Sequence, residues 1–91
     1  MEITNLLKAE AKRKEAEITY KKTLLSIEND EIERLMNAVN DYYAQRFNKP
    51  DETPRHRQAF FDHVSFLKRH IDDSRALMEE IAELKGESVI Y

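Results

Sequence analysis

Apolar residues recur at spacings of three, four or seven along two long stretches of the chain, about residues 3–47 and 54–86. Such spacing places side chains on one side of an α-helix. We therefore predict an all-α protein with two long helices. The apolar positions are Ile3, Leu7, Ala11, Ile18, Leu25, Ile32, Met36, Val39, Tyr43 and Phe47 in the first stretch, then Phe60, Val64, Leu67, Ile71, Met78 and Ile81 in the second, where Ser74 is a polar residue in phase with them.

Helix-breaking residues are confined to the segment between the two stretches and to the end of the second. Both prolines lie in residues 48–54, so we predict a loop at 48–53 with Thr53 capping a helix that begins at Pro54. Gly86, the only glycine, is the expected stop of that helix. The apolar pattern of the first helix continues in phase through Asn29 and Asp30. We predict one helix there, with at most a bend.

Charge is distributed in the same direction along both predicted helices. Each is basic in its first half and acidic in its second. In the first helix the basic residues lie in 8–22 and the acidic residues in 28–33, and in the second helix they lie in 55–69 and 72–83. Parallel helices would place like charge beside like charge, whereas an antiparallel hairpin places opposite charges side by side. The sequence therefore predicts an antiparallel two-helix hairpin.

The predicted hairpin leaves apolar surface without a partner. Folding the chain at residue 51 leaves about a dozen residues of the first helix overhanging, so that Ile3, Leu6 and Leu7 have no neighbour within the chain. A seam between two helices also needs only a narrow apolar stripe, and the second helix is apolar beyond it. We therefore predict a homodimer of hairpins. The surplus apolar residues of the second helix are Phe61 on one flank and Phe66, Leu77 and Leu84 on the other.

Composition fits one helical domain, residues 1–91, with 36% charged and 41% hydrophobic residues. The absence of cysteine excludes disulfides and thiolate metal sites. No apolar run approaches the roughly 18 residues of a membrane span, and the first residues lack the pattern of a signal peptide. We expect a cytoplasmic protein with no membrane partner and no cofactor.

Four charged residues fall on the apolar side of the first helix: Lys14, Lys21, Glu28 and Arg46. Folding at residue 51 would place Lys21 near Glu80 and Glu28 near Ser74. Polar residues in such seams fix register and oligomeric state, and we assign them that role. The alternative is an anion pocket in a small helical-bundle enzyme.

Three histidines, His56, His63 and His70, are spaced by seven residues and form a stripe on the second helix. Successive members are about 10 Å apart, too far to share one metal ion, although Asp73 follows His70 by one turn. We predict no metal site and interpret the stripe as half-buried polar residues at the edge of an interface. A pH-sensitive interface is the alternative interpretation.

Six of the eight aromatic residues gather near the predicted loop, and most of them are expected to pack there. Tyr42 and Phe61 lie at the edges of their apolar arcs, where an exposed ring can anchor another protein. The candidate partner-binding residues are Tyr42, Phe61, Phe66, Leu77 and Leu84.

A basic arm in the first helix is the candidate contact for nucleic acid, through Lys8, Lys12, Arg13 and Lys22. Interleaved glutamates and a net charge of −3 disfavour that use. The final residues, 87–91, are expected either to fray or to dock on the overhanging arm or on a partner.

The sequence has no Ser/His/Asp set, glycine-rich phosphate loop or paired metal ligands at helical spacing. We therefore predict a non-enzymatic protein–protein interaction module, such as an adaptor, small chaperone or phage-type inhibitor, acting as a hairpin dimer. A nucleic-acid-binding hairpin dimer is the alternative, and an anion-binding enzyme is third.

Overall fold

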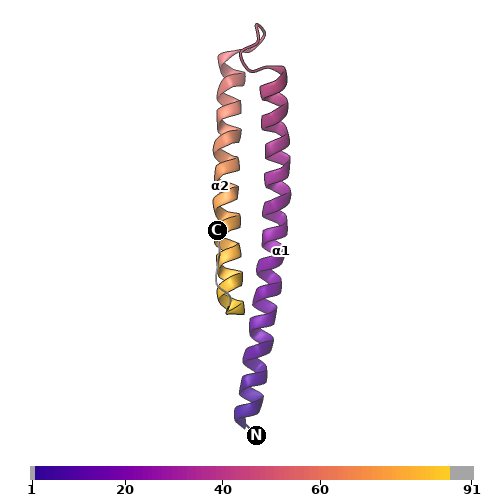
Figure 1. The fold of residues 1–91 in the computed structure, drawn as a ribbon, viewed down its shortest axis with the longest axis vertical. Coiled ribbons are helices and arrows are strands. Elements are labelled where there is room, and N and C mark those ends of the chain that lie inside the picture. Colours follow the sequence, from indigo (N-terminus) through magenta and orange to yellow (C-terminus); the bar gives the residue numbers. More distant parts are fainter. Residues whose placement is uncertain (1, 87–91) are drawn as a thin grey trace.

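The protein is a hairpin of two α-helices in the computed structural model, which describes residues 2–86. Helix α1 spans Glu2–Gln45 and helix α2 spans Pro54–Lys85. The helices lie side by side and antiparallel in a rod of 74 × 21 × 16 Å (Figure 1). The predicted two-helix fold is confirmed, with each boundary within two residues of its expected position.

Helix α1 is continuous through Asn29 and Asp30 and ends at Gln45, two residues before its predicted end. The chain turns there because the N–H groups of Arg46 and Phe47 both donate to the carbonyl of Tyr42, at 2.8 and 3.1 Å. Asn48 then adopts a left-handed conformation, with φ of 59°. Asparagine tolerates that conformation better than most residues, so it ends the helix without a glycine.

Both ends of α2 follow the predicted capping chemistry. Thr53 accepts a hydrogen bond through its hydroxyl from the N–H of His56, at 3.2 Å, and Pro54 occupies the first helical turn. Gly86 has a left-handed φ of 72°, and its N–H donates to the carbonyl of Glu83 at 3.0 Å. These contacts satisfy backbone groups that the helix itself leaves unpaired.

Glu52 organises the loop, a role that the sequence pattern did not reveal. Its side chain is only 7% exposed and accepts hydrogen bonds from the Tyr42 hydroxyl at 2.7 Å and from Arg57 Nη1 at 3.2 Å. The backbone N–H of Asn48 also donates to Glu52 Oε1, at 3.4 Å. One carboxylate therefore ties the end of α1, the loop and the start of α2 together.

The core between the helices is thin. Within residues 2–86 the buried hydrophobic side chains are Leu35 on α1 and Ile81 on α2, and the one buried polar residue is Ser74. The Ser74 hydroxyl donates to Asn29 Oδ1 across the seam at 3.2 Å. The stability of the hairpin therefore depends on a few side chains.

The predicted register is correct, but one side chain reaches a partner other than the expected one. Lys21 Nζ lies 2.7 Å from Glu80 Oε2, as folding at residue 51 requires, and this hydrogen bond raises the pKa of Lys21. Glu28 was expected near Ser74, but it contacts His70 instead. The helices are nevertheless level at this point, because the next residue, Asn29, is hydrogen-bonded to Ser74. The Glu28 side chain is long enough to reach His70, one turn further along the hairpin.

Helix α1 runs past the end of α2 (Figure 1). Ile3, Leu6 and Leu7 on this overhanging arm are 74%, 68% and 61% exposed, as the sequence predicted. The segment 87–91, for which docking or fraying was predicted, lies outside the described residues. No helix in the described part combines the length and apolar character needed to cross a membrane.

Candidate functional site

An apolar face runs along one side of the hairpin. On α2, Val64, Ile71 and Met78 are spaced by seven residues and all remain exposed beside the seam. On α1, Met36 and Tyr43 form an equivalent exposed row. Viewed from the N-terminus of its own helix, each row is turned about the helix axis in the same direction from the seam. Because the two helices run in opposite directions, the two rows lie on the same side of the hairpin.

Half-buried side chains fill the space between these two rows. We define the apolar face as Leu25, Ile32, Met36, Val39 and Tyr43 of α1 together with Phe61, Val64, Ile71 and Met78 of α2. Monomeric proteins rarely expose a continuous apolar strip of this length, and such strips mark contact sites for other molecules. The apolar face is therefore the first candidate site.

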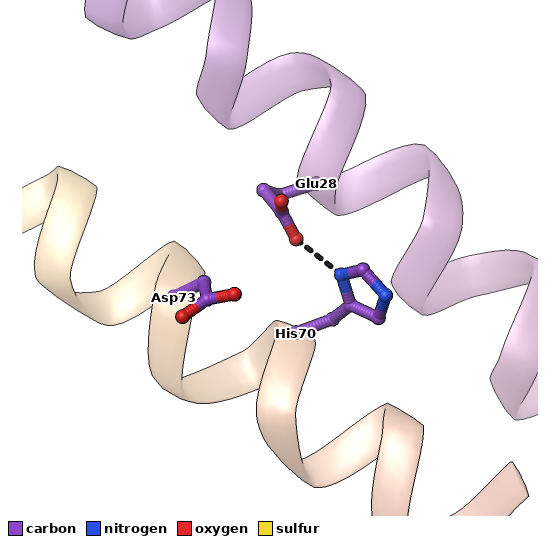
Figure 2. A group of neighbouring side chains, drawn as sticks. All are labelled: Glu28, His70 and Asp73. Carbon is purple, nitrogen blue, oxygen red and sulfur yellow. Dashed lines mark hydrogen bonds and ion pairs between the residues drawn. The ribbon is translucent and has the colours of Figure 1, made fainter.

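A cluster of metal-ligating side chains lies on the opposite side of the seam. Glu28 comes from α1, and His70 and Asp73 come from successive turns of α2 (Figure 2). His70 Nδ1 lies 2.5 Å from Glu28 Oε2, and one ligand atom from each of the three residues lies within 4.8 Å of the others. Glu28 and His70 are half-buried and Asp73 is exposed.

Glu31 adds a further carboxylate to this side of the hairpin, one turn after Glu28 on α1. Its hydrogen bonds with Arg34 hold the pKa of Glu31 below its usual range, and the charge of His70 lowers that pKa further. Glu31 is therefore within electrostatic reach of the imidazole while its own oxygens are engaged by Arg34. His70 therefore has Glu28 and Asp73 beside it and the charge of Glu31 further away.

The three histidines occupy different environments. The His56 ring lies 3.4 Å from Arg46 Nη1, His63 Nδ1 lies 2.7 Å from the carbonyl of Ala59, and His70 contacts Glu28. Each imidazole therefore has a different neighbour, and His70 is distinguished from the other two by its carboxylate partner. The use of the three histidines as a pH-sensitive stripe stays a prediction.

The predicted partner-binding residues divide into two groups. Phe61 and Phe66 are 49% and 50% exposed, on opposite sides of the hairpin. Tyr42, Leu77 and Leu84 are half-buried. Tyr42 is further engaged within the chain, because its ring stacks on Phe60 with centroids 4.8 Å apart and its hydroxyl donates to Glu52. Of the predicted anchors, the structure leaves the two phenylalanines most accessible.

Tyr42 gives this end of the hairpin a measurable response to alkaline pH. Burial and the hydrogen bond to Glu52 raise the pKa of Tyr42 from 10.0 to about 12. A raised pKa means that folding favours the protonated phenol, so this contribution to stability is complete below pH 10 and is lost as pH rises towards about 12. We expect one of the four tyrosines to ionise only near pH 12 in an ultraviolet titration. Tyr42→Phe should remove that late step and Tyr43→Phe should retain it; a late step that survives Tyr42→Phe would contradict the assignment.

The two remaining predicted sites use basic residues. Lys8, Lys12, Arg13 and Lys22 are exposed on α1, and their use in binding nucleic acid stays a prediction. Of the residues considered for an anion pocket, Lys14 and Lys21 line one hollow at the end of the seam, where Lys21 is paired with Glu80. Arg46 is about 37 Å from Lys21 along the hairpin, and the anion pocket stays a prediction.

Comparison of the chain with protein-family models, with curated proteins and with solved structures found no match. The candidate sites are therefore the apolar face and the cluster formed by Glu28, His70 and Asp73. Spacing along α2 pairs His70 with Asp73, but Glu28 joins them only across the seam. The signal in the sequence was that Glu28, level with Ser74, can reach a side chain one turn away on α2.

Proposed function

We propose that this protein is a non-enzymatic interaction module that works as a dimer of hairpins. The observation that carries the proposal is the uncovered apolar face, along which Val64, Ile71 and Met78 of α2 lie beside Met36 and Tyr43 of α1. A second copy of the same face is its proposed occupant. Two copies related by a two-fold axis would form a bundle of four helices, in which each apolar face covers the other.

The amount of exposed surface supports this assembly. The chain exposes 7482 Å², whereas a compact monomer of 10.8 kDa is expected to expose about 5,500 Å². A stable interface buries about 800 Å² from each partner, and homodimer interfaces are often larger and more apolar. The excess of about 1,900 Å² therefore exceeds what a stable dimer requires.

Apolar residues outside the apolar face supply the surface for another protein. Phe66 lies on the opposite side of α2 and is half exposed, and Ile3 and Leu6 lie on the overhanging arm without neighbours from α2. In a dimer of hairpins these residues stay available. Adaptors, small chaperones and protein inhibitors all use exposed aromatic and aliphatic anchors of this kind.

Sedimentation of the untagged protein over a range of concentrations tests the dimer. We expect a species of twice the 10.8 kDa chain mass. Ile71→Glu places a carboxylate within the apolar face and should cost at least about 2 kcal/mol of dimerisation, or about thirtyfold in the dissociation constant. Ile27 is 59% exposed on the other side of the hairpin, so Ile27→Glu is the matched control and should leave the dimer intact.

A folded monomer at every concentration would rule out the dimer. Equal dissociation by both variants would rule out the apolar face as its interface. The interaction role is tested separately by using the native protein and its Phe66→Ala variant as bait. A specific partner should be retained by the native dimer and lost from the variant while both still sediment as dimers. Retention that is insensitive to Phe66 would place the partner site elsewhere than proposed.

A further inference from the structure

The cluster of Glu28, His70 and Asp73 is built from both helices. Glu28 and His70 are 42 residues apart in sequence, and their side chains meet across the seam at 2.5 Å (Figure 2). Asp73 follows His70 by one turn of α2, and its carboxylate completes a set of ligand atoms within 4.8 Å of one another. Neither helix alone supplies these three groups.

We propose that this cluster is a binding site for a divalent transition-metal ion of the zinc class. Zinc accepts imidazole nitrogen and carboxylate oxygen together, whereas magnesium and calcium prefer oxygen ligands alone. His70 therefore favours a transition metal over either of those ions. Three protein ligands leave at least one coordination position for water or another small ligand.

The geometry requires only a small closure of the cluster. Zinc lies about 2.0–2.2 Å from its nitrogen and oxygen ligands, so ligand atoms around one ion are about 3.3 Å apart. Glu28 and His70 are already closer than that, and the ion would replace the hydrogen shared between them. The wider separations within 4.8 Å are reduced by side-chain rotation, for which the exposed Asp73 side chain has room.

The backbone around the cluster is already fixed. The residues that follow Glu28 and Asp73 are Asn29 and Ser74, and their side chains are hydrogen-bonded to each other across the seam at 3.2 Å. Ser74 is buried, so this bond holds α1 and α2 at a constant separation beside the ligands. Binding an ion would therefore require little rearrangement of the helices.

The local charge also favours a cation. The carboxylates of Glu28 and Asp73 balance the charge of one divalent ion, and Glu31 adds negative charge nearby. Arg34 engages the oxygens of Glu31, so Glu31 would act through its charge and not as a ligand. The site lies on the side of the hairpin opposite the apolar face, so ion binding does not depend on dimerisation.

Zinc titration of the untagged protein by calorimetry tests the site, because a histidine tag would bind zinc itself. We expect saturable binding of one Zn²⁺ per chain and little response to Mg²⁺. An ion that joins α1 to α2 binds the folded state selectively, so Zn²⁺ should also raise the midpoint of thermal unfolding by several degrees. Co²⁺ provides a spectroscopic probe, since its visible absorption changes when nitrogen and oxygen ligands replace water.

Three variants remove one ligand each: Glu28→Gln, His70→Ala and Asp73→Asn. Each should weaken Zn²⁺ binding by at least about tenfold, as the loss of even an outer contact to a metal ligand does. Glu28→Gln and Asp73→Asn preserve side-chain size, so circular dichroism should show both to be folded. His63→Ala is the matched control because it removes another half-buried histidine of α2, and Zn²⁺ affinity should not change.

Three results would overturn the proposal. The first is the absence of saturable Zn²⁺ binding by the native protein. The second is a loss of affinity in His63→Ala as large as in His70→Ala, which would mean that the ion binds outside the cluster. The third is unchanged affinity in Glu28→Gln and Asp73→Asn, which would mean that the carboxylates are not ligands. All three are independent of the oligomeric state measured by sedimentation.

Discussion

Replacing Leu35 with alanine should lower the free energy of unfolding by about 3 kcal/mol, which is the middle of the range for a buried leucine. Leu35 is 2% exposed and is the most completely buried side chain within residues 2–86. Its removal leaves a cavity in the seam, and Ile81 is the other buried apolar side chain of that core. Urea unfolding followed by circular dichroism, at one fixed protein concentration, measures the loss.

This loss is a substantial fraction of the free energy of unfolding that a small domain commonly has, about 5–15 kcal/mol. Ile27→Ala removes the same class of side chain from a position that is 59% exposed, so it should cost less than about 0.5 kcal/mol. Equal losses in the two variants would mean that Leu35 is not the centre of the packing. A Leu35→Ala loss below about 1 kcal/mol would contradict the role of the seam.

Phe60→Ala should also cost about 3 kcal/mol, through the aromatic cluster at the loop end of the hairpin. The centroid of the Phe60 ring lies 4.8 Å from that of Tyr42 and 5.5 Å from those of Phe47 and Phe61. Removing the central ring exposes Tyr42, so the tyrosine that ionises near pH 12 should ionise at lower pH. Urea unfolding and an ultraviolet titration of the same variant measure the two effects.

The matched control is Phe66→Ala, which removes a phenylalanine of α2 that lies outside the aromatic cluster and is 50% exposed. It should cost less than about 1 kcal/mol and leave the titration of Tyr42 unchanged. An unchanged late ionisation in Phe60→Ala would show that Phe60 does not shield the phenol. The stability loss and the titration shift therefore check one packing arrangement by two independent measurements.

The helices and their ends were predictable because local chemistry determines them. Thr53 and Pro54 begin α2 through a cap and a preset backbone angle, and Gly86 ends it by adopting a left-handed conformation. The end of α1 was predicted two residues too late. There the helix ends because Asn48 adopts a positive φ and Glu52 binds back to Tyr42, and these contacts form only when the loop is folded.

Register was predictable, but the contacts that individual side chains make across the seam were not all predictable. The pair formed by Lys21 and Glu80 follows from folding the chain at residue 51 and from the opposed charge gradients. The partner of Glu28 does not follow from the register. Matching the levels of two helices leaves open which neighbour a long side chain reaches. In the structure Glu28 contacts His70, and Ser74 is hydrogen-bonded to Asn29.

The sequence by itself determined two long helices, their antiparallel order and the overhanging arm, because periodicity, capping and charge act along the chain and need no knowledge of the fold. Only the tertiary structure decided which groups meet across the seam, and so created the cluster of Glu28, His70 and Asp73 (Figure 2). Contacts between helices depend on the rotation of each helix about its axis and on side-chain rotamers. Spacing along one helix specifies neither quantity.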